Sequence, residues 1–419
     1  MRAKGLGEPN RNFWLGVYNG VLVNGGEAFF HNSLVLAPFL AVLGAPAWAI
    51  GLIPAVRTGG WYVPQLFVAS RLAHQPFKLP VYRRASTVRV LAYVLMTVAV
   101  FTLGASPGLV IAIVLTSLGV SAIAGGVGGV PFADVTAKVV PHYRLGTFWA
   151  LRNAIGGGLA LLSGWVLATL LDGPLPFPLD FAVVFALGTL LMGGAYLAFA
   201  FVREPAGPVA MRQPLLTMVG RIPNILRVDD SFRRYLRVRF LARFALLAEP
   251  FYAVHAINAL GANVSWLGLF VVVATFASIT TNFALRGLAN RAQNVTVLQI
   301  SGVLLVLAPL AALTIPDPRV YVLVFALSAA GVSAMEIAAW NLLYAVSPAA
   351  ERPLYVGVAN SVLALPSLAP VASGALSVWT GFPPLFALAA IVAAGALAFS
   401  FRFVRMRDLD RAALEGAPR

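Results

Sequence analysis

The stretch REPAGPVAMRQPLLTMVGRIPNILRVDDSFRRYLRVRFLAR, residues 203–243, divides the sequence into two hydrophobic blocks of similar size. It holds nine arginines and no lysine, and its only acidic residues are Glu204, Asp229 and Asp230. Each flanking block resolves into about six hydrophobic stretches long enough to cross a bilayer as helices. We therefore predict two membrane-embedded halves joined by a basic linker at the membrane surface.

The composition indicates a membrane protein. Sixty per cent of the 419 residues are hydrophobic, 11% are charged, and the mean hydropathy is +0.85. A water-soluble chain of this composition would have too little polar surface to cover itself. The net charge of +15 could suggest a nucleic-acid partner, but no soluble basic domain is visible to bind one. The chain has no cysteine, which excludes disulfides and thiolate metal sites.

The predicted fold class is an all-α membrane protein with twelve transmembrane helices in two pseudo-symmetric six-helix bundles. The predicted domains are an N-terminal bundle at 1–202, a basic cytoplasmic linker at 203–234, and a C-terminal bundle with a cytoplasmic tail at 235–419. The predicted spans are 13–42, 46–70, 86–105, 107–138, 146–171, 179–202, 236–259, 264–286, 295–315, 319–346, 354–379 and 383–404.

The distribution of basic residues predicts the orientation, because loops rich in Lys and Arg stay on the cytoplasmic side. With the N-terminus inside, only Arg57 and Arg319 of the 30 basic residues fall outside the cytoplasmic segments. We expect a multi-pass protein of the plasma or inner membrane, with both termini and the linker in the cytoplasm. The arginines of the linker suit anionic lipid head groups.

The two halves of the sequence repeat some features in the same order. The motif GVSA occurs at 119–122 and again at 331–334, and each copy is followed by a proline and, twelve residues later, by Asn153 or Asn360. Because six helices per half give both copies the same orientation, this is a parallel repeat, as in transporters whose halves rock about a central site.

In these features the chain resembles the major facilitator superfamily. The best local match is Gly287-Leu-Ala-Asn-Arg291, which is similar to the glycine-acid/amide-arginine loop signature of that family. The corresponding stretch of the first half, 69–84, keeps the cations but lacks the glycine and the acidic residue. No Gly-Pro-Gly-Gly antiporter pattern occurs in the fifth span, which has only Gly156 to Gly158 and Gly164. The resemblance implies transport by alternating access, with no enzymatic activity.

Ionisable and polar residues inside the spans are the candidate functional residues, because a charge in the bilayer is costly and normally faces a partner or water. On the first span Asn24, Glu27 and His31 share one helical face. The proton-coupling candidates are Glu27, Glu249 and Glu336. The substrate-binding candidates are Asn24, His31, Arg57, Trp61, Gln65, Tyr252, Trp340 and Tyr344. A carboxyl group desolvated in a cavity is easier to protonate, which suits proton uptake during transport.

Structural roles are the alternative for several of these residues. Glu27 and Arg57 could form an ion pair that only locks two helices together. His31 and His255 are more simply explained as packing residues. The aromatic candidates Trp61 and Trp340 could equally face lipid or pack between helices.

A second group of candidates lies at predicted cytoplasmic helix ends and suits gating. These residues are Asp134, Lys138, Arg152, Asn290 and Arg291. We expect Asp134 to pair with a cation of the fifth helix or of the 71–89 loop when the cytoplasmic side is closed. The alternative is a surface bridge between Asp134 and Lys138 that contributes only a few tenths of a kcal/mol, roughly.

The sequence therefore predicts a secondary active transporter of a small organic solute, monomeric and coupled to protons, without cofactor or metal. No phosphate-binding Gly-Lys-Ser/Thr loop and no His-Glu-x-x-His motif is present, so neither ATP-driven transport nor a zinc hydrolase is indicated. The alternative from another class is a non-transporting membrane receptor that binds a soluble partner through the basic linker. Arg57 favours an anionic solute, whereas the carboxylates and aromatic residues favour a cationic one.

Overall fold

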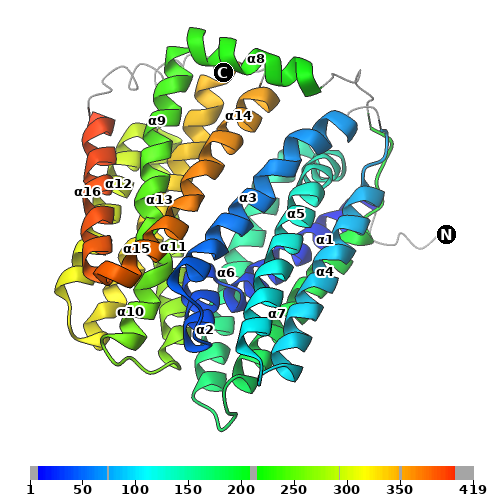
Figure 1. Cartoon of the computed structure of the whole chain (residues 1–419). Helices are drawn as coiled ribbons and strands as arrows, with labels where there is room; N and C mark the ends of the chain where they lie inside the picture. Colours follow the sequence, from blue (N-terminus) through cyan, green and yellow to red (C-terminus); the bar gives the residue numbers. More distant parts are fainter. Residues whose placement is uncertain (1–7, 73–74, 208–214, 292, 349–351, 402–419) are drawn as a thin grey trace. The chain divides into compact units, whose positions relative to one another are not determined.

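The computed structural model describes residues 8–72, 75–207, 215–291, 293–348 and 352–401, and these ranges contain helices and connecting segments but no strand (Figure 1). Ten helices in these ranges are long and apolar enough to cross a membrane. The prediction of an all-α membrane protein is confirmed at this level, while the count of twelve spans stays a prediction.

The helices follow one another with short connections. In chain order they are α1 (Glu8–Phe29), η1 (Asn32–Leu36), α2 (Ala37–Val42), α3 (Ala47–Leu72), α4 (Leu79–Thr102), α5 (Pro107–Val139), η2 (His142–Arg144), α6 (Leu145–Leu171), α7 (Leu179–Ala200), α8 (Leu215–Val228), α9 (Asp230–Phe244), η3 (Ala245–Phe251), α10 (Tyr252–Asn258), α11 (Trp266–Asn290), α12 (Asn294–Thr314), α13 (Pro318–Val346), α14 (Arg352–Ala364), η4 (Leu365–Leu368), α15 (Ala369–Thr380) and α16 (Phe382–Phe401).

The first predicted span, residues 13–42, is not one continuous helix. α1 ends at Phe29, and the chain continues through the short π-helix η1 into α2. At the break the carbonyl oxygen of Phe30 accepts a 2.8 Å hydrogen bond from Nη1 of Arg57. This side chain is a hydrogen-bond partner for a backbone carbonyl group at the end of α1. Neither α1 nor α3 is among the ten apolar spans.

The second half of the predicted linker is helical, and the helix is interrupted before the next span. The chain forms two helices there, α8 and α9, which are separated at Asp229. The side chain of Asp229 accepts a hydrogen bond from the backbone N–H of Phe232 and so caps α9, while its second oxygen accepts one from the Tyr355 hydroxyl. The span that was predicted to begin at residue 236 therefore begins earlier, at Asp230.

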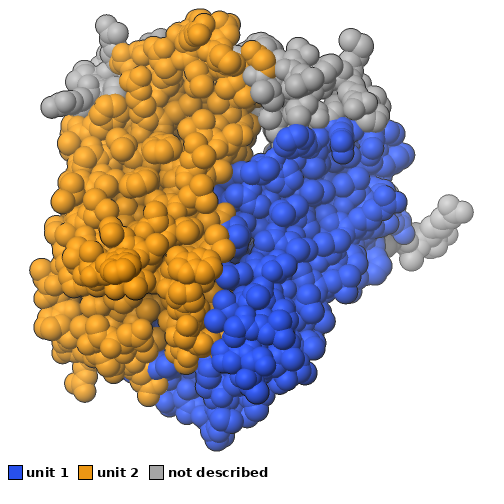
Figure 2. All heavy atoms as spheres, in the orientation of Figure 1, with its two compact units in different colours: residues 1–31, 56–215, 264–272 blue, residues 32–55, 216–263, 273–419 orange. Residues whose placement is uncertain are grey.

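The structure divides into two compact units that do not coincide with the halves of the sequence (Figure 2). Unit 1 comprises residues 1–31, 56–215 and 264–272, and unit 2 comprises residues 32–55, 216–263 and 273–419. A short segment of each half thus packs with most of the other half. The predicted division into two six-helix bundles stays a prediction.

In unit 1, α1 packs between α6 and α7, and α4 packs against α5 and α7. Glycines allow the close approach of these helices: a Cβ atom at Gly20 of α1 would collide with the side chain of Arg152, and one at Gly156 of α6 would collide with Asn24. The segment 264–272 packs equally closely against α6, since a Cβ atom at Gly268 would overlap the backbone of α6 at Ala168.

In unit 2, α12 packs against α13 and α16, and α9 packs against α13, α14 and α16. The segment 32–55 contacts η3, α10 and α15 through close backbone approaches. A Cβ atom at Gly51 would overlap the backbone at Pro370, and one at Gly374 would overlap the carbonyl group of Ala47. The Ser373 hydroxyl also donates a 3.0 Å hydrogen bond to the carbonyl oxygen of Leu247, which ties α15 to η3.

Candidate functional site

The first candidate group lies in unit 1, where Glu27 of α1 meets Arg57 of α3. Oε2 of Glu27 and Nη2 of Arg57 are 2.6 Å apart, and Nη1 of the same guanidinium binds the carbonyl oxygen of Phe30. The predicted proximity of these two residues is therefore present in the structure. The break after α1 and the ion pair are coupled, because one arginine side chain serves both.

A second arginine, Arg89 of α4, lies beside this pair. Its guanidinium carbon is 4.7 Å from the ring centroid of Tyr196 and 5.6 Å from that of Trp61, within range for cation–π contacts. Trp61 in turn lies against the glycines of α5, because a Cβ atom at Gly125 would come within 3 Å of its ring. Arg89 falls inside the predicted span 86–105 and was also counted with the basic residues of the 71–89 segment; in the structure it lies within α4, which begins at Leu79.

The Glu27 side chain keeps 37% of its surface accessible, and that of Arg57 keeps 17%. An ionised group this deep in a membrane span is very costly if it faces lipid, whereas it is tolerated beside water. The accessible side of the Glu27–Arg57 pair is therefore expected to border a water-filled space. Lipid contact is the less favourable explanation for the same exposure.

The other predicted site residues of unit 1 do not form one cluster with the ion pair, and each has its own surroundings. Nδ2 of Asn24 donates a 3.1 Å hydrogen bond to the carbonyl oxygen of Arg152 on α6, so Asn24 joins two helices. His31 and Gln65 are both partly buried, at the end of the first helical segment and on α3 respectively. Trp61 is partly exposed, with 36% of its surface accessible.

The second candidate group lies in unit 2, where Glu336 of α13 binds two arginines of α9. Oε1 of Glu336 is 3.2 Å from Nη2 of Arg239 and 3.0 Å from Nη2 of Arg243. The side chain of Arg239 is almost completely buried, at 4% accessible, whereas that of Glu336 is 35% accessible. One carboxylate oxygen thus faces two guanidinium groups between α9 and α13.

Glu249 differs from the other two intramembrane glutamates in its hydrogen-bond partner, which is a hydroxyl group, while Arg243 lies within electrostatic range of it. Glu249 lies on η3 and is hydrogen-bonded to the hydroxyl of Ser33, a buried residue of η1. Tyr252, which follows on α10, is buried and packs against Phe386 with ring centroids 5.2 Å apart. A serine hydroxyl can both donate and accept, so it can stay hydrogen-bonded to the carboxyl group in either protonation state.

His255 packs among aromatic rings, as the structural alternative proposed. Its ring centroid is 5.2 Å from that of Phe386 and 5.9 Å from those of Tyr321 and Phe382. Trp340 and Tyr344 lie one turn apart on α13 with ring centroids 5.9 Å apart, and both are more than 40% exposed. They continue the face of α13 that carries Glu336, since the three residues are spaced by four.

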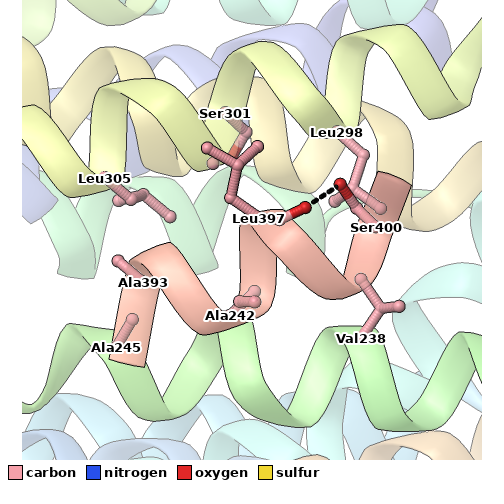
Figure 3. A pocket seen from close by; sticks show the side chains of 11 residues that line it. Val238, Ala242, Ala245, Leu298, Ser301, Leu305, Ala393, Leu397 and Ser400 are labelled. Carbon is pink, nitrogen blue, oxygen red and sulfur yellow. Dashed lines mark hydrogen bonds between the residues drawn. The ribbon is translucent and has the colours of Figure 1, made fainter. Parts of the chain in front are cut away.

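A small pocket in unit 2 lies between α9, α12 and α16 (Figure 3). Its lining is apolar apart from two serines, and both hydroxyl groups are already used: Ser301 donates to the carbonyl oxygen of Gly331 and Ser400 to that of Leu397. The pocket offers no polar group to a ligand, so it is a packing gap rather than a binding site. The charged cluster at Glu336 lies outside its lining.

The predicted gating residue Asp134 lies in a network of charges in unit 1. Its two carboxylate oxygens bind Lys78 at 2.5 Å and Lys138 at 2.6 Å. Lys138 also contacts Glu204 at 2.8 Å, and Glu204 accepts hydrogen bonds from the backbone N–H groups of Lys78 and Leu79 at the start of α4. The network therefore joins the end of α5, the start of α4 and the segment that follows α7.

The remaining gating candidates do not join this network. Arg152 is buried in an aromatic surround, with its guanidinium carbon 5.2 to 5.3 Å from the ring centroids of Phe132, Phe148 and Trp149, and it donates to the carbonyl oxygen of Gly16 and to Oδ1 of Asn19. Asn290 and Arg291 are exposed at the end of α11.

Sequence analysis did not single out Arg89, Arg239 or Arg243 as site residues. The last two were counted with the basic linker, because a run of arginines gives no sign of where the membrane begins. The signal that could have found them is spacing: Arg239 and Arg243 are four residues apart and share one helical face, as Glu336 and Trp340 do on α13.

No family model matches the sequence, and no curated protein matches it. Solved structures do match. A variant of the nucleoside transporter NupG is 13% identical with a TM-score of 0.73 over 94% of this chain and 100% of its own. A peptide transporter of the POT family in complex with 5-aminolevulinic acid is 10% identical, with a TM-score of 0.71 over 94% and 95%. A D-xylose–proton symporter is 12% identical, with a TM-score of 0.68 over 94% and 97%. At these identities the likeness concerns the fold.

Proposed function

We propose that this chain, which has the major-facilitator-type fold of these transporters, is a secondary active transporter that moves a small organic solute by alternating access. The observation that carries the proposal is the likeness of fold over nearly the whole chain. Ionised side chains within apolar helices support it, because such groups are costly in a membrane protein that only docks a partner. We place it in the cell membrane with twelve spans, two six-helix bundles and both termini in the cytoplasm.

Proton coupling is the second part of the proposal, and Glu249 is the residue to which we assign it. Glu27 and Glu336 are held by arginines, so proton uptake at either one disturbs an ion pair. Glu249 has a serine hydroxyl as its partner and can change protonation at smaller cost. One proton that enters with the solute and leaves on the other side would couple transport to the pH gradient.

The test uses the purified full chain in proteoliposomes that contain a trapped pH-sensitive dye. Solutes of the classes named for the matched structures, a nucleoside, D-xylose and a dipeptide, are added together with small carboxylic acids and sugar phosphates. A transported solute is expected to acidify the lumen in the wild type. The Glu249→Gln variant is expected to lose that signal while still exchanging the solute across the membrane.

Asp230→Asn is the matched control, because Asp230 is an exposed carboxylate at the start of the same span and pairs with Arg233 and Arg234 there. It is expected to behave as the wild type. Proton movement that is equal in the wild type and in Glu249→Gln would show that Glu249 is not the coupling residue. If none of the solutes moves under any gradient, the transport proposal itself is wrong.

A further inference from the structure

We propose that Arg239 and Arg243 bind an anionic group of the solute, a carboxylate or a phosphate, and that Glu336 occupies this anion site when the solute is absent. The inference rests on the proposed function for the idea that the ligand is a transported solute. The site itself is argued from the side chains of unit 2.

The burial of the two arginines is the first argument. Both lie on α9, and their side chains are only 4% and 19% accessible. Guanidinium groups enclosed to this extent require negative partners. Both bind the same oxygen of Glu336, and Arg243 also lies within electrostatic range of Glu249.

The unused donors of Arg239 are the second argument. The Nε and Nη1 atoms of this side chain are buried and find no acceptor among the described residues, and only 4% of the side chain is accessible. A buried charged donor without an acceptor is strongly unfavourable, so native structures rarely retain one without a functional reason. A ligand with two anionic oxygens can satisfy such donors, because a guanidinium presents parallel N–H groups to a carboxylate or phosphate.

Glu336 supplies the third argument, because it is the accessible part of the cluster. Its side chain is 35% accessible while Arg239 behind it is 4% accessible. An anion that approaches from the open side therefore meets Glu336 first and must displace its Oε1 from the arginines. The carboxylate of Glu336 is thus a competitor built into the site, which keeps the arginines paired between transport cycles.

The aromatic residues beside the cluster indicate what else the ligand carries. Trp340 and Tyr344 extend along α13 from Glu336, and they leave 41% and 48% of their surfaces exposed. An amphipathic solute can place its charged end at the arginines and its apolar or ring portion against these side chains. The expected class is a small organic acid or phosphate ester with such a portion.

The experiment measures binding to the purified full chain in phosphatidylcholine nanodiscs by calorimetric titration. Each probe anion is paired with its uncharged counterpart: benzoate with benzamide, lactate with lactamide, and phenyl phosphate with phenol. At least one anion is expected to bind the wild type about tenfold or more tightly than its neutral counterpart. The Arg239→Gln variant is expected to lose about ten- to a hundredfold in affinity for that anion and little for the neutral compound.

Two further variants separate the site from general effects on folding. Arg237→Gln removes an exposed arginine of the same helix and is expected to bind as the wild type. Glu336→Gln removes the competitor and is expected to bind the anion more tightly than the wild type, a gain that a misfolded variant does not give. Equal losses in Arg237→Gln and Arg239→Gln, or weaker binding in Glu336→Gln, would overturn the proposal.

The remaining outcomes show whether the anion-site proposal or the transport proposal is wrong. Absence of selectivity for every probe anion, or full competition by chloride or by added phosphatidylglycerol, contradicts an organic anion site. Proton-driven transport of an uncharged solute without anion selectivity would leave the transport proposal standing and remove this one. Selective anion binding through Arg239 without any transport would leave the anion site standing and remove the transport proposal.

Discussion

The intramembrane charges of this protein fall into two kinds at the level of single residues. Glu27 and Arg57 are matched one to one, and the arginine is further held by the carbonyl oxygen of Phe30. In unit 2, Arg239 and Arg243 share one oxygen of Glu336, and two buried donors of Arg239 have no acceptor among the described residues. A one-to-one pair can be purely structural, whereas donors without an acceptor can serve a further anion. The two groups are therefore expected to respond differently to substitution.

Arg57→Gln tests whether the pair in unit 1 is structural. Removing one member of a fully buried pair costs about 3–5 kcal/mol. Because 37% of the Glu27 side chain is accessible, solvent reduces this cost, and we expect about 1–3 kcal/mol. The expected result is a lower melting temperature in detergent for Arg57→Gln and recovery in the double variant Glu27→Gln/Arg57→Gln. A double variant as unstable as the single one contradicts a structural role for the pair.

Much of the charged site could be predicted from residue types and depth, and the rest could not. Glu27 and Arg57 stand out because each interrupts an apolar run, and the length of helix before each one places them at similar depth. Arg239 and Arg243 do not stand out, because they continue an arginine-rich run that suits the cytoplasmic surface equally well. The hydrogen bond that the Ser33 hydroxyl donates to Glu249 joins residues far apart in the sequence, and no local pattern predicts it.

At the scale of elements, the break between α1 and η1 and the division of the linker at Asp229 both depend on side chains from elsewhere. Arg57 of α3 binds at the first break and Tyr355 of α14 binds at the second. The lengths of the hydrophobic stretches predict one continuous span over 13–42. They give no sign that the helix at the end of the linker is interrupted at Asp229. Element type was therefore predictable, but these boundaries were set by tertiary contacts.

The close approach of α3 to α15 gives a prediction for Gly51. A Cβ atom there would overlap the backbone at Pro370, which cannot move as a flexible side chain does. Gly51→Ala is expected to destabilise the protein by about 1–3 kcal/mol through overpacking. Gly59→Ala, on the same helix with no neighbouring atom within 4 Å of the added methyl group, is the control and is expected to be neutral or slightly stabilising. Equal melting temperatures for the two variants would contradict the close packing of α3 and α15.

The network around Asp134 links three elements and suits a contact that forms and breaks during transport. Both of its lysines belong to unit 1, so Asp134→Asn removes two ion pairs at once. We expect this variant to change the transport rate severalfold with nearly unchanged affinity for the solute, as measured by initial rates of uptake over a range of concentrations. A defect in affinity alone argues against gating.

At the scale of the whole molecule, the resemblance to the major facilitator superfamily is confirmed as a likeness of fold by solved structures that match over more than nine-tenths of the chain. Hydrophobic run lengths and the central basic linker were enough to predict this architecture. Substrate and coupling were not predictable in the same way, because structures that are 10 to 13% identical to this chain include nucleoside, peptide and sugar transporters.

The predicted topology is testable because the chain has no cysteine of its own. Asn263→Cys, in the connection after α10, is expected to react with a membrane-impermeant maleimide added outside intact cells. Asn290→Cys, at the end of α11, is expected to react only after permeabilisation. Both positions are exposed, so access to the reagent depends on the side of the membrane. The reverse pattern would invert the orientation, and equal labelling of both from outside would contradict the alternation of spans.

The central claim is that the protein uses an ion gradient to concentrate a solute. The most direct measurement is the ratio of internal to external concentration of a radiolabelled solute in proteoliposomes under an imposed pH gradient. We expect this ratio to rise above one, to collapse when a protonophore is added, and not to rise in Glu249→Gln. A ratio that reaches one and never exceeds it, whatever the gradient, would identify a passive pathway and contradict secondary active transport.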